Sequence, residues 1–119
     1  MLAPISDSLI VTLKAQPLLV ITTCANADDA RALAAALVGD RLAACVNAIP
    51  QISSTYRWAG KIEVADECLL LIKTTRDRYP ALEGAIKARS KYELPEILAV
   101  RIDAASAEYL RWIEASVAD

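Results

Sequence analysis

Two long apolar segments joined by a short turn constrain the fold of this chain more than any other feature. Residues 42–58 begin as AACVNAI, are interrupted at Pro50 and resume as ISSTYRW, and residues 61–74 read KIEVADECLLLIKT. The tripeptide Trp58-Ala59-Gly60 between them ends in glycine, which readily adopts the left-handed backbone of a hairpin turn. The sequence therefore predicts a long β-hairpin.

The register of this hairpin decides which side chains share a face. A three-residue turn pairs Tyr56 with Ile62 and Ser54 with Val64, whereas a two-residue turn reverses the faces of one strand. We expect the three-residue turn. The outer half of the ribbon is too apolar for one small chain to cover, and a two-stranded ribbon is marginally stable in water. We therefore expect residues 50–68 to pack on another subunit.

Strand and helix patterns alternate around the hairpin. The β-branched run 18–23 predicts a central strand covered on both faces, and residues 96–102 predict another strand. Apolar residues at helical spacing, together with candidate N-caps, predict three helices. These are 27–38 after Asn26, 78–89 after Asp77 and 104–116 after Asp103.

The order of these elements is β-α-β-β-α-β followed by a helix. This order predicts an α+β fold of the ferredoxin-like type, with an antiparallel sheet, helices on one face, a long β-hairpin and an added C-terminal helix. Residues 1–16 read as an N-terminal extension, and residues 17–119 as one domain.

Composition excludes several classes of function. The 119 residues include no His, which rules out a Ser-His-Asp triad, a Cys-His dyad and zinc sites that use histidine. The net charge of −2 argues against a nucleic-acid-binding module, because such modules usually carry a strongly basic surface. No apolar run approaches the ~18 residues of a membrane span. We expect a binding protein that is not an enzyme and requires no cofactor.

The three cysteines, Cys24, Cys45 and Cys68, follow no metal-binding spacing. An odd number predicts a free thiol and a reducing, cytoplasmic location. Cys24 precedes the helix cap Asn26, where the helix N-terminus could lower its pKa, although a strand end can equally bury it. Cys24 and Cys45 are the candidate ligands for a soft ion such as Cu²⁺, if the fold or a three-fold axis brings thiolates together.

Acidic and aromatic residues form the second candidate site. The loop before the last strand can approach the hairpin, within one chain or across an interface. A Glu and a Lys that meet in such a cleft could shift each other's pKa and hold a polar ligand, although ordinary ion pairing is the alternative. The aromatic residues could line the pocket or cover interface area. The predicted cleft residues are Trp58, Glu67, Lys73, Tyr92 and Glu96.

Four strings in the sequence are specific enough to indicate a family. They are LAACVN (42–47), YRWAGK (56–61), IKTT (72–75) and YELPEI (92–97). Over about residues 18–114 the chain resembles the CutA family of divalent-cation tolerance proteins. The resemblance implies a ferredoxin-like subunit in a tight homotrimer, whose long hairpins pair between subunits as in an assembly like the PII signalling trimers. It also implies a role in tolerance of copper and other divalent cations, with copper as a bound ion.

The chain departs from the family pattern at one stretch. The family commonly has a His-Pro-Tyr or His-His-Pro-Tyr stretch before its Pro-Glu-Ile, where this chain reads Arg89-Ser90-Lys91-Tyr92. Neither a hydroxyl nor an ammonium can replace imidazole as a Cu²⁺ ligand. Two functions therefore stay open. One is a trimeric metal- or ligand-binding protein in divalent-cation tolerance, and the other is a PII-like sensor that binds a polar small molecule in the cleft between subunits, without a specific metal site.

Overall fold

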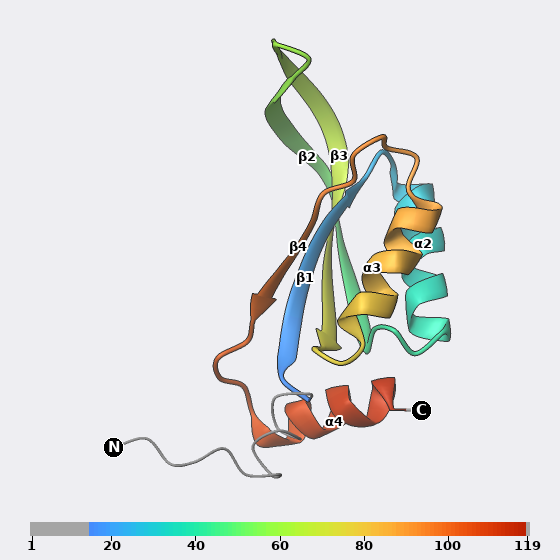
Figure 1. Ribbon diagram of the computed structural model, residues 1–119, viewed down its shortest axis with the longest axis vertical. Helices are drawn as coiled ribbons and strands as arrows, with labels where there is room; N and C mark the ends of the chain where they lie inside the picture. Colours follow the sequence, from blue (N-terminus) through green and yellow to red (C-terminus); the bar gives the residue numbers. More distant parts are fainter. Residues whose placement is uncertain (1–14, 119) are drawn as a thin grey trace.

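The computed structural model describes residues 15–118 and confirms the α+β, ferredoxin-like fold (Figure 1). Four antiparallel strands form one sheet in the order β2-β3-β1-β4. Residues 1–14 of the expected extension lie outside the described residues, and the Gln16 side chain donates a hydrogen bond to the Ile102 carbonyl at 3.0 Å. The elements are β1 (Pro17–Cys24), α2 (Ala27–Gly39), β2 (Cys45–Trp58), β3 (Lys61–Thr75), α3 (Tyr79–Arg89), β4 (Ile97–Arg101) and α4 (Ala107–Val117).

The main core lies between the sheet and the helices α2 and α3, which cover the same face (Figure 1). Residues of β1 alternate, so that Leu18 and Val20 are buried and the residues between them are half-buried. Leu37 from α2 and Leu82 from α3 are fully buried in the same core. Burying each such side chain contributes about 1.5–3 kcal/mol, so this layer supplies most of the stability of the chain.

Only one of the three predicted helix caps is correct. The side chain of Asn26 accepts a hydrogen bond at the start of α2, as predicted. Helix α3 begins after Arg78, which makes no side-chain cap, so the prediction for Asp77 is wrong. Helix α4 is capped by the hydroxyl of Ser106 and not by Asp103, because the turn of helix begins three residues later than the sequence pattern indicated.

The hairpin turn has two residues and not the expected three. Ala59 and Gly60 have φ values of 50° and 80°, and Trp58 pairs with Lys61. Two successive positive φ values match the right-handed twist of the flanking strands, which explains why the tight turn is preferred. The expected pairing of Tyr56 with Ile62 is therefore wrong.

A β-bulge occupies the position where the sequence predicted an interruption. Ile49 pairs with Leu69 and Ile52 with Glu67, so that Pro50 and Gln51 together lie opposite one residue of β3. Proline has no N–H for the ladder, and Gln51 takes up the left-handed backbone with φ 58°. Strand β2 continues through the bulge. Before the bulge its odd-numbered residues share the face of Leu69 and Glu67, and beyond the bulge its even-numbered residues share that face.

The second face of the sheet carries a broad apolar surface that α2 and α3 do not cover. We call it the open face, and it contains the β4 residues Leu98 and Val100, which are 55% and 51% exposed. The sequence predicted that β1 is covered on both faces, but this chain covers only one face of β1 with its own helices. The other large apolar residues of the open face are Leu19, Ile21, Ile49, Leu69 and Leu71.

Among the helices of residues 15–118, none is long and apolar enough to cross a membrane.

Replacing Gly60 by alanine should destabilise the hairpin, because its φ of 80° is costly for any residue with a Cβ. We expect the free energy of unfolding to fall by about 1 kcal/mol in urea denaturation. Gly84→Ala in α3 is the matched control, since neither glycine has an atom within 4 Å of an added Cβ. The control should gain about 0.5–1 kcal/mol because alanine favours a helix interior. A loss of equal size in both variants would contradict the turn assignment.

Candidate ligand-binding cleft

A cleft of about 860 Å³ lies between the outer half of the hairpin and the segment 91–96. Four of the five residues predicted to form a binding cleft line it, namely Trp58, Glu67, Tyr92 and Glu96. The hairpin supplies the first two, and the segment between α3 and β4 supplies the others. The structure therefore joins two parts of the chain that are far apart in sequence.

The pairing of the outer half of β2 with β3 aligns the hairpin side of the cleft. In an antiparallel pair, directly opposite residues share a face, so Ile52 lies on the face of Glu67. Tyr56 and Trp58 follow at even spacing and therefore lie on this face too. The two-residue turn sets this register, and a shift of one residue in the pairing would move both aromatic side chains to the face away from Glu67.

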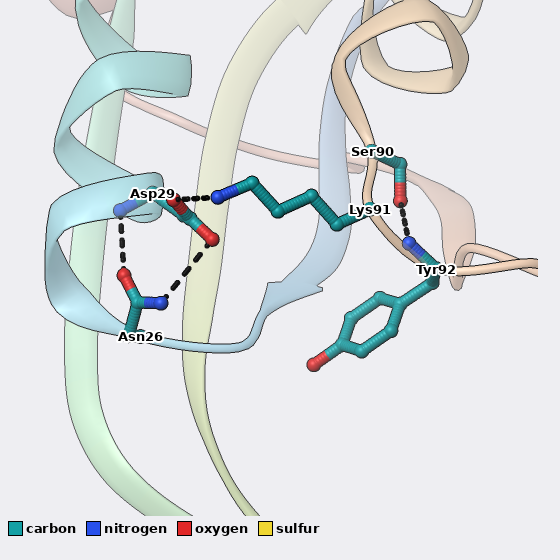
Figure 2. A network of polar contacts seen from close by, with 5 residues as sticks. All are labelled: Asn26, Asp29, Ser90, Lys91 and Tyr92. Carbon is teal, nitrogen blue, oxygen red and sulfur yellow. Dashed lines mark hydrogen bonds and ion pairs between the residues drawn. The ribbon is translucent and has the colours of Figure 1, made fainter.

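The segment 91–96 is anchored to the N-terminus of α2 by a polar network (Figure 2). The Lys91 ammonium lies 2.9 Å from the carboxylate of Asp29, whose backbone N–H donates to the Asn26 side chain at 2.8 Å. The backbone N–H of Tyr92 donates to the Ser90 hydroxyl at 3.1 Å. These contacts fix the backbone on which Tyr92 is carried.

Ser90 and Lys91 both have positioning contacts (Figure 2). Ser90 ends α3 with an extended backbone, and its hydroxyl closes the turn to Tyr92. Lys91 holds the turn against α2. The two residues therefore keep the segment attached to the cleft.

Tyr92 and Glu67 make the closest polar contact between the two sides of the cleft. The phenol donates a hydrogen bond to a carboxylate oxygen of Glu67 at 2.6 Å. Burial acts to raise the pKa of Glu67, but hydrogen bonds from the hydroxyls of Ser54, Tyr92 and Thr23 outweigh it and lower the pKa. Burial and the same contact with Glu67 raise the pKa of Tyr92. Glu67 is therefore an ionised acceptor at neutral pH, and Tyr92 a neutral donor.

Lys73, the fifth predicted cleft residue, lies elsewhere in this chain. It is six residues beyond Glu67 along β3, about 20 Å away in an extended strand. Its ammonium donates to the side-chain oxygen of Asn47 and lies 3.9 Å from the Cys45 sulfur. The prediction that Lys73 meets Glu67 and Glu96 is not met within one chain.

The cysteines do not come together as metal ligands. Cys24 pairs with Cys68 across β1 and β3 on the helix-covered face, whereas Cys45 pairs with Lys73 near the other end of the sheet, on the open face. Burial, then the neighbouring Cys68, raises the pKa of Cys24 to about 11, so Cys24 is the thiol buried at a strand end that the sequence allowed, and not one whose pKa the helix N-terminus lowers. All three thiols are free. Within residues 15–118, no three His, Cys, Asp or Glu residues are grouped to hold a metal ion.

Several residues of the cleft could not be found from the sequence. Tyr56 and Glu93 line the cleft but are not among the five residues that the sequence predicts there. The hydroxyls of Thr23 and Ser54 hydrogen-bond Glu67 and are not among them either. Their placement depends on the pairing of β3 with β1 and with β2, and no short stretch of the sequence fixes that register.

The amino-acid sequence matches the family described as CutA1 divalent ion tolerance protein over residues 18–116. The chain belongs to the CutA1 family. It is 45% identical over 94 residues to the divalent-cation tolerance protein CutA of Thermus thermophilus, covering 79% of this chain and 91% of that one. It is 44% identical over 91 residues to human Protein CutA, covering 76% of this chain but only 51%, about half, of the human protein.

Solved CutA1 structures share the fold over most of the chain. The crystal structure of CutA1 from Oryza sativa superposes with a TM-score of 0.85 at 36% identity, covering 87% of this chain and 95% of that one. A structure described as the periplasmic CutA of Archaeoglobus fulgidus superposes with a TM-score of 0.83 at 33% identity, covering 86% and 99%. The family resemblance found in the sequence is thereby confirmed.

Replacing Tyr92 by phenylalanine should raise the pKa of Glu67, because the carboxylate loses its 2.6 Å hydrogen bond. A carboxylate whose pKa is lowered by folding stabilises the protein above its ordinary pKa of 4.5, and this stabilisation is lost as the pH falls. The stability of the variant should therefore fall less steeply in acid than that of the parent.

An NMR titration of the glutamate carboxyl carbons measures the pKa of Glu67 directly. Tyr79→Phe is the control, since it removes a phenol that donates to Glu83 at 3.3 Å and should leave Glu67 unchanged. An unaltered titration of Glu67 in Tyr92→Phe would show that this contact does not set its pKa.

Proposed function

We propose that this member of the CutA1 family acts in divalent-cation tolerance as a homotrimeric sensor that binds a small polar ligand, and not as an enzyme. The observation that carries the proposal is the cleft of about 860 Å³ with an ionised Glu67 facing Tyr92. Its size falls in the range of about 300–1,000 Å³ that is typical of small-molecule sites. Its aromatic and acidic lining supplies binding groups, and no nucleophile activated by a neighbouring base lies in it.

A homotrimeric assembly is supported by the apolar surfaces that one chain leaves uncovered. The open face exposes Leu98 and Val100, and the hairpin exposes Ile62 and Val64 by 70% and 66%. Neighbouring large apolar residues of this kind mark interaction surfaces rather than ordinary solvent-facing residues. Copies of one chain that cover each other's sheet and hairpin would bury both surfaces. In a closed ring of such copies, none of these surfaces is left exposed.

The proposal gives copper no site of its own in this chain. Cys24 and Cys45 lie on opposite faces of the sheet, and the carboxylates of the cleft are not grouped as ligands. A role in divalent-cation tolerance would then come from the ligand that the cleft senses. The proposal also includes a cytoplasmic location, because free thiols are typical of a reducing compartment.

The assembly is tested by placing a charge on the open face. Leu98→Asp should convert the trimer into smaller species, because a carboxylate buried at an apolar interface costs several kcal/mol. Light scattering should give the mass of three chains for the parent and a smaller mass for the variant. Val38→Asp is the matched control, since Val38 is 44% exposed on α2 and away from the open face. A monomeric parent, or equal effects of the two substitutions, would refute the proposed interface.

Ligand binding is tested by thermal unfolding with a panel of anionic, neutral and cationic metabolites. A ligand at 100 times its Kd should stabilise the protein by about 2.7 kcal/mol. The shift should vanish in Trp58→Leu and persist in Trp112→Leu, in which a tryptophan of similar exposure, 47% against 42%, is removed outside the cleft. If no compound stabilises the parent, or if both variants lose the effect, the cleft is not the ligand site.

A further inference from the structure

The charge on Glu67 has no cationic partner in the described part of the chain. Its hydrogen-bond donors are the neutral hydroxyls of Ser54, Tyr92 and Thr23, and none of the ion pairs within residues 15–118 includes it. Hydroxyl groups keep a carboxylate ionised without neutralising its charge. Glu67 therefore presents a negative charge to whatever occupies the cleft.

The other charged residues of the cleft leave this negative charge in place. Glu93 and Glu96 add two exposed carboxylates. Of the two basic residues in the lining, Lys91 is already paired with Asp29 at 2.9 Å. Arg57 is then the one unpaired basic residue in the described lining beside three carboxylates, so the cleft attracts cations and repels anions.

Three aromatic side chains make the cleft suited to an organic cation. Tyr56 and Trp58 are 45% and 42% exposed within the single chain, and both line the cleft together with Tyr92 on the segment 91–96. The face of an aromatic ring attracts a cation within about 6 Å, and tryptophan does so best. An organic ammonium group carries a single charge and therefore holds its water less strongly than a divalent metal ion, which favours its contact with ring faces.

A divalent metal ion fits the same cleft poorly. Mg²⁺ and Ca²⁺ need about six to eight oxygen ligands converging on one point. No three acidic or thiol side chains within residues 15–118 are grouped in that way. The lining thus has the charge for a cation but lacks the ligand geometry for a metal.

We propose that the cleft binds a small organic ammonium compound, whose N–H groups donate to Glu67 and whose cationic end lies against the rings of Trp58 and Tyr92. This inference rests on the proposed sensor function and names the chemical class of its ligand. The volume of about 860 Å³ leaves room for an aliphatic chain, so that a second ammonium group can reach the carboxylate of Glu93 or Glu96.

Calorimetric titration of the full chain with 1,4-diaminobutane tests this assignment. Two compounds of the same chain length provide the comparison, the neutral 1,4-butanediol and the anionic succinate. We expect the diamine to bind and to bind at least about tenfold more tightly than the other two, because only it can form charge-assisted hydrogen bonds to Glu67. Equal binding of the diol or the succinate would overturn the proposal.

Charge-neutralising variants locate the bound ammonium group. Glu67→Gln should weaken diamine binding at least about tenfold. Glu114→Gln, which removes one exposed carboxylate from α4, should leave binding unchanged. If Glu67→Gln is poorly folded, the double variant Glu93→Gln and Glu96→Gln uses exposed positions and should still weaken binding several-fold. Unchanged binding in these cleft variants would overturn the assignment.

The outcome also separates this inference from the proposed function. An anion or a neutral compound that stabilises the parent but not Trp58→Leu would keep the sensor function and refute the ammonium class. A panel in which no compound binds, diamines included, would refute both.

Discussion

The register of β2 against β3 controls which side chains meet in the cleft. Trp58 pairs with Lys61 and Ile52 with Glu67, so that Trp58 and Glu67 lie on one face of the hairpin. The two-residue turn at Ala59 and Gly60 sets this register. The Pro50–Gln51 bulge then takes up one extra residue, so that Ile49 pairs with Leu69 in the packed sheet. A shift of one residue in the outer pairing would separate the aromatic side chains from the carboxylate.

The same sheet serves two purposes on its two faces. Against α2 and α3 it forms an ordinary packed core, in which residues such as Val20 and Ile72 are fully buried. On the open face, residues such as Leu98 remain exposed at a cost that a monomer would not ordinarily carry. The long hairpin projects beyond this core at one end (Figure 1). A two-stranded ribbon of this kind is only marginally stable by itself in water.

The cleft lies where the hairpin leaves the packed sheet and the segment 91–96 crosses to β4. Lys91 and Ser90 hold that segment in place, and Tyr92 links it to Glu67 by a hydrogen bond. Ser90 and Lys91 thus contribute to the cleft by holding the backbone that carries Tyr92. Electrostatics follows from this arrangement, because hydroxyl donors keep Glu67 ionised while no described cation neutralises it.

The order of the elements and the long hairpin could be predicted from the sequence, because hydrophobic periodicity and turn residues are local signals. The family followed from the resemblance of four short strings, and the same sequence indicated Trp58, Glu67, Tyr92 and Glu96 as cleft residues, which the structure brings together. The register, the separation of Lys73 from the cleft and the raised pKa of Cys24 emerge only in the folded chain. Each of these depends on strand pairing and burial, which arise between residues far apart in the chain and leave no mark in any short stretch of sequence.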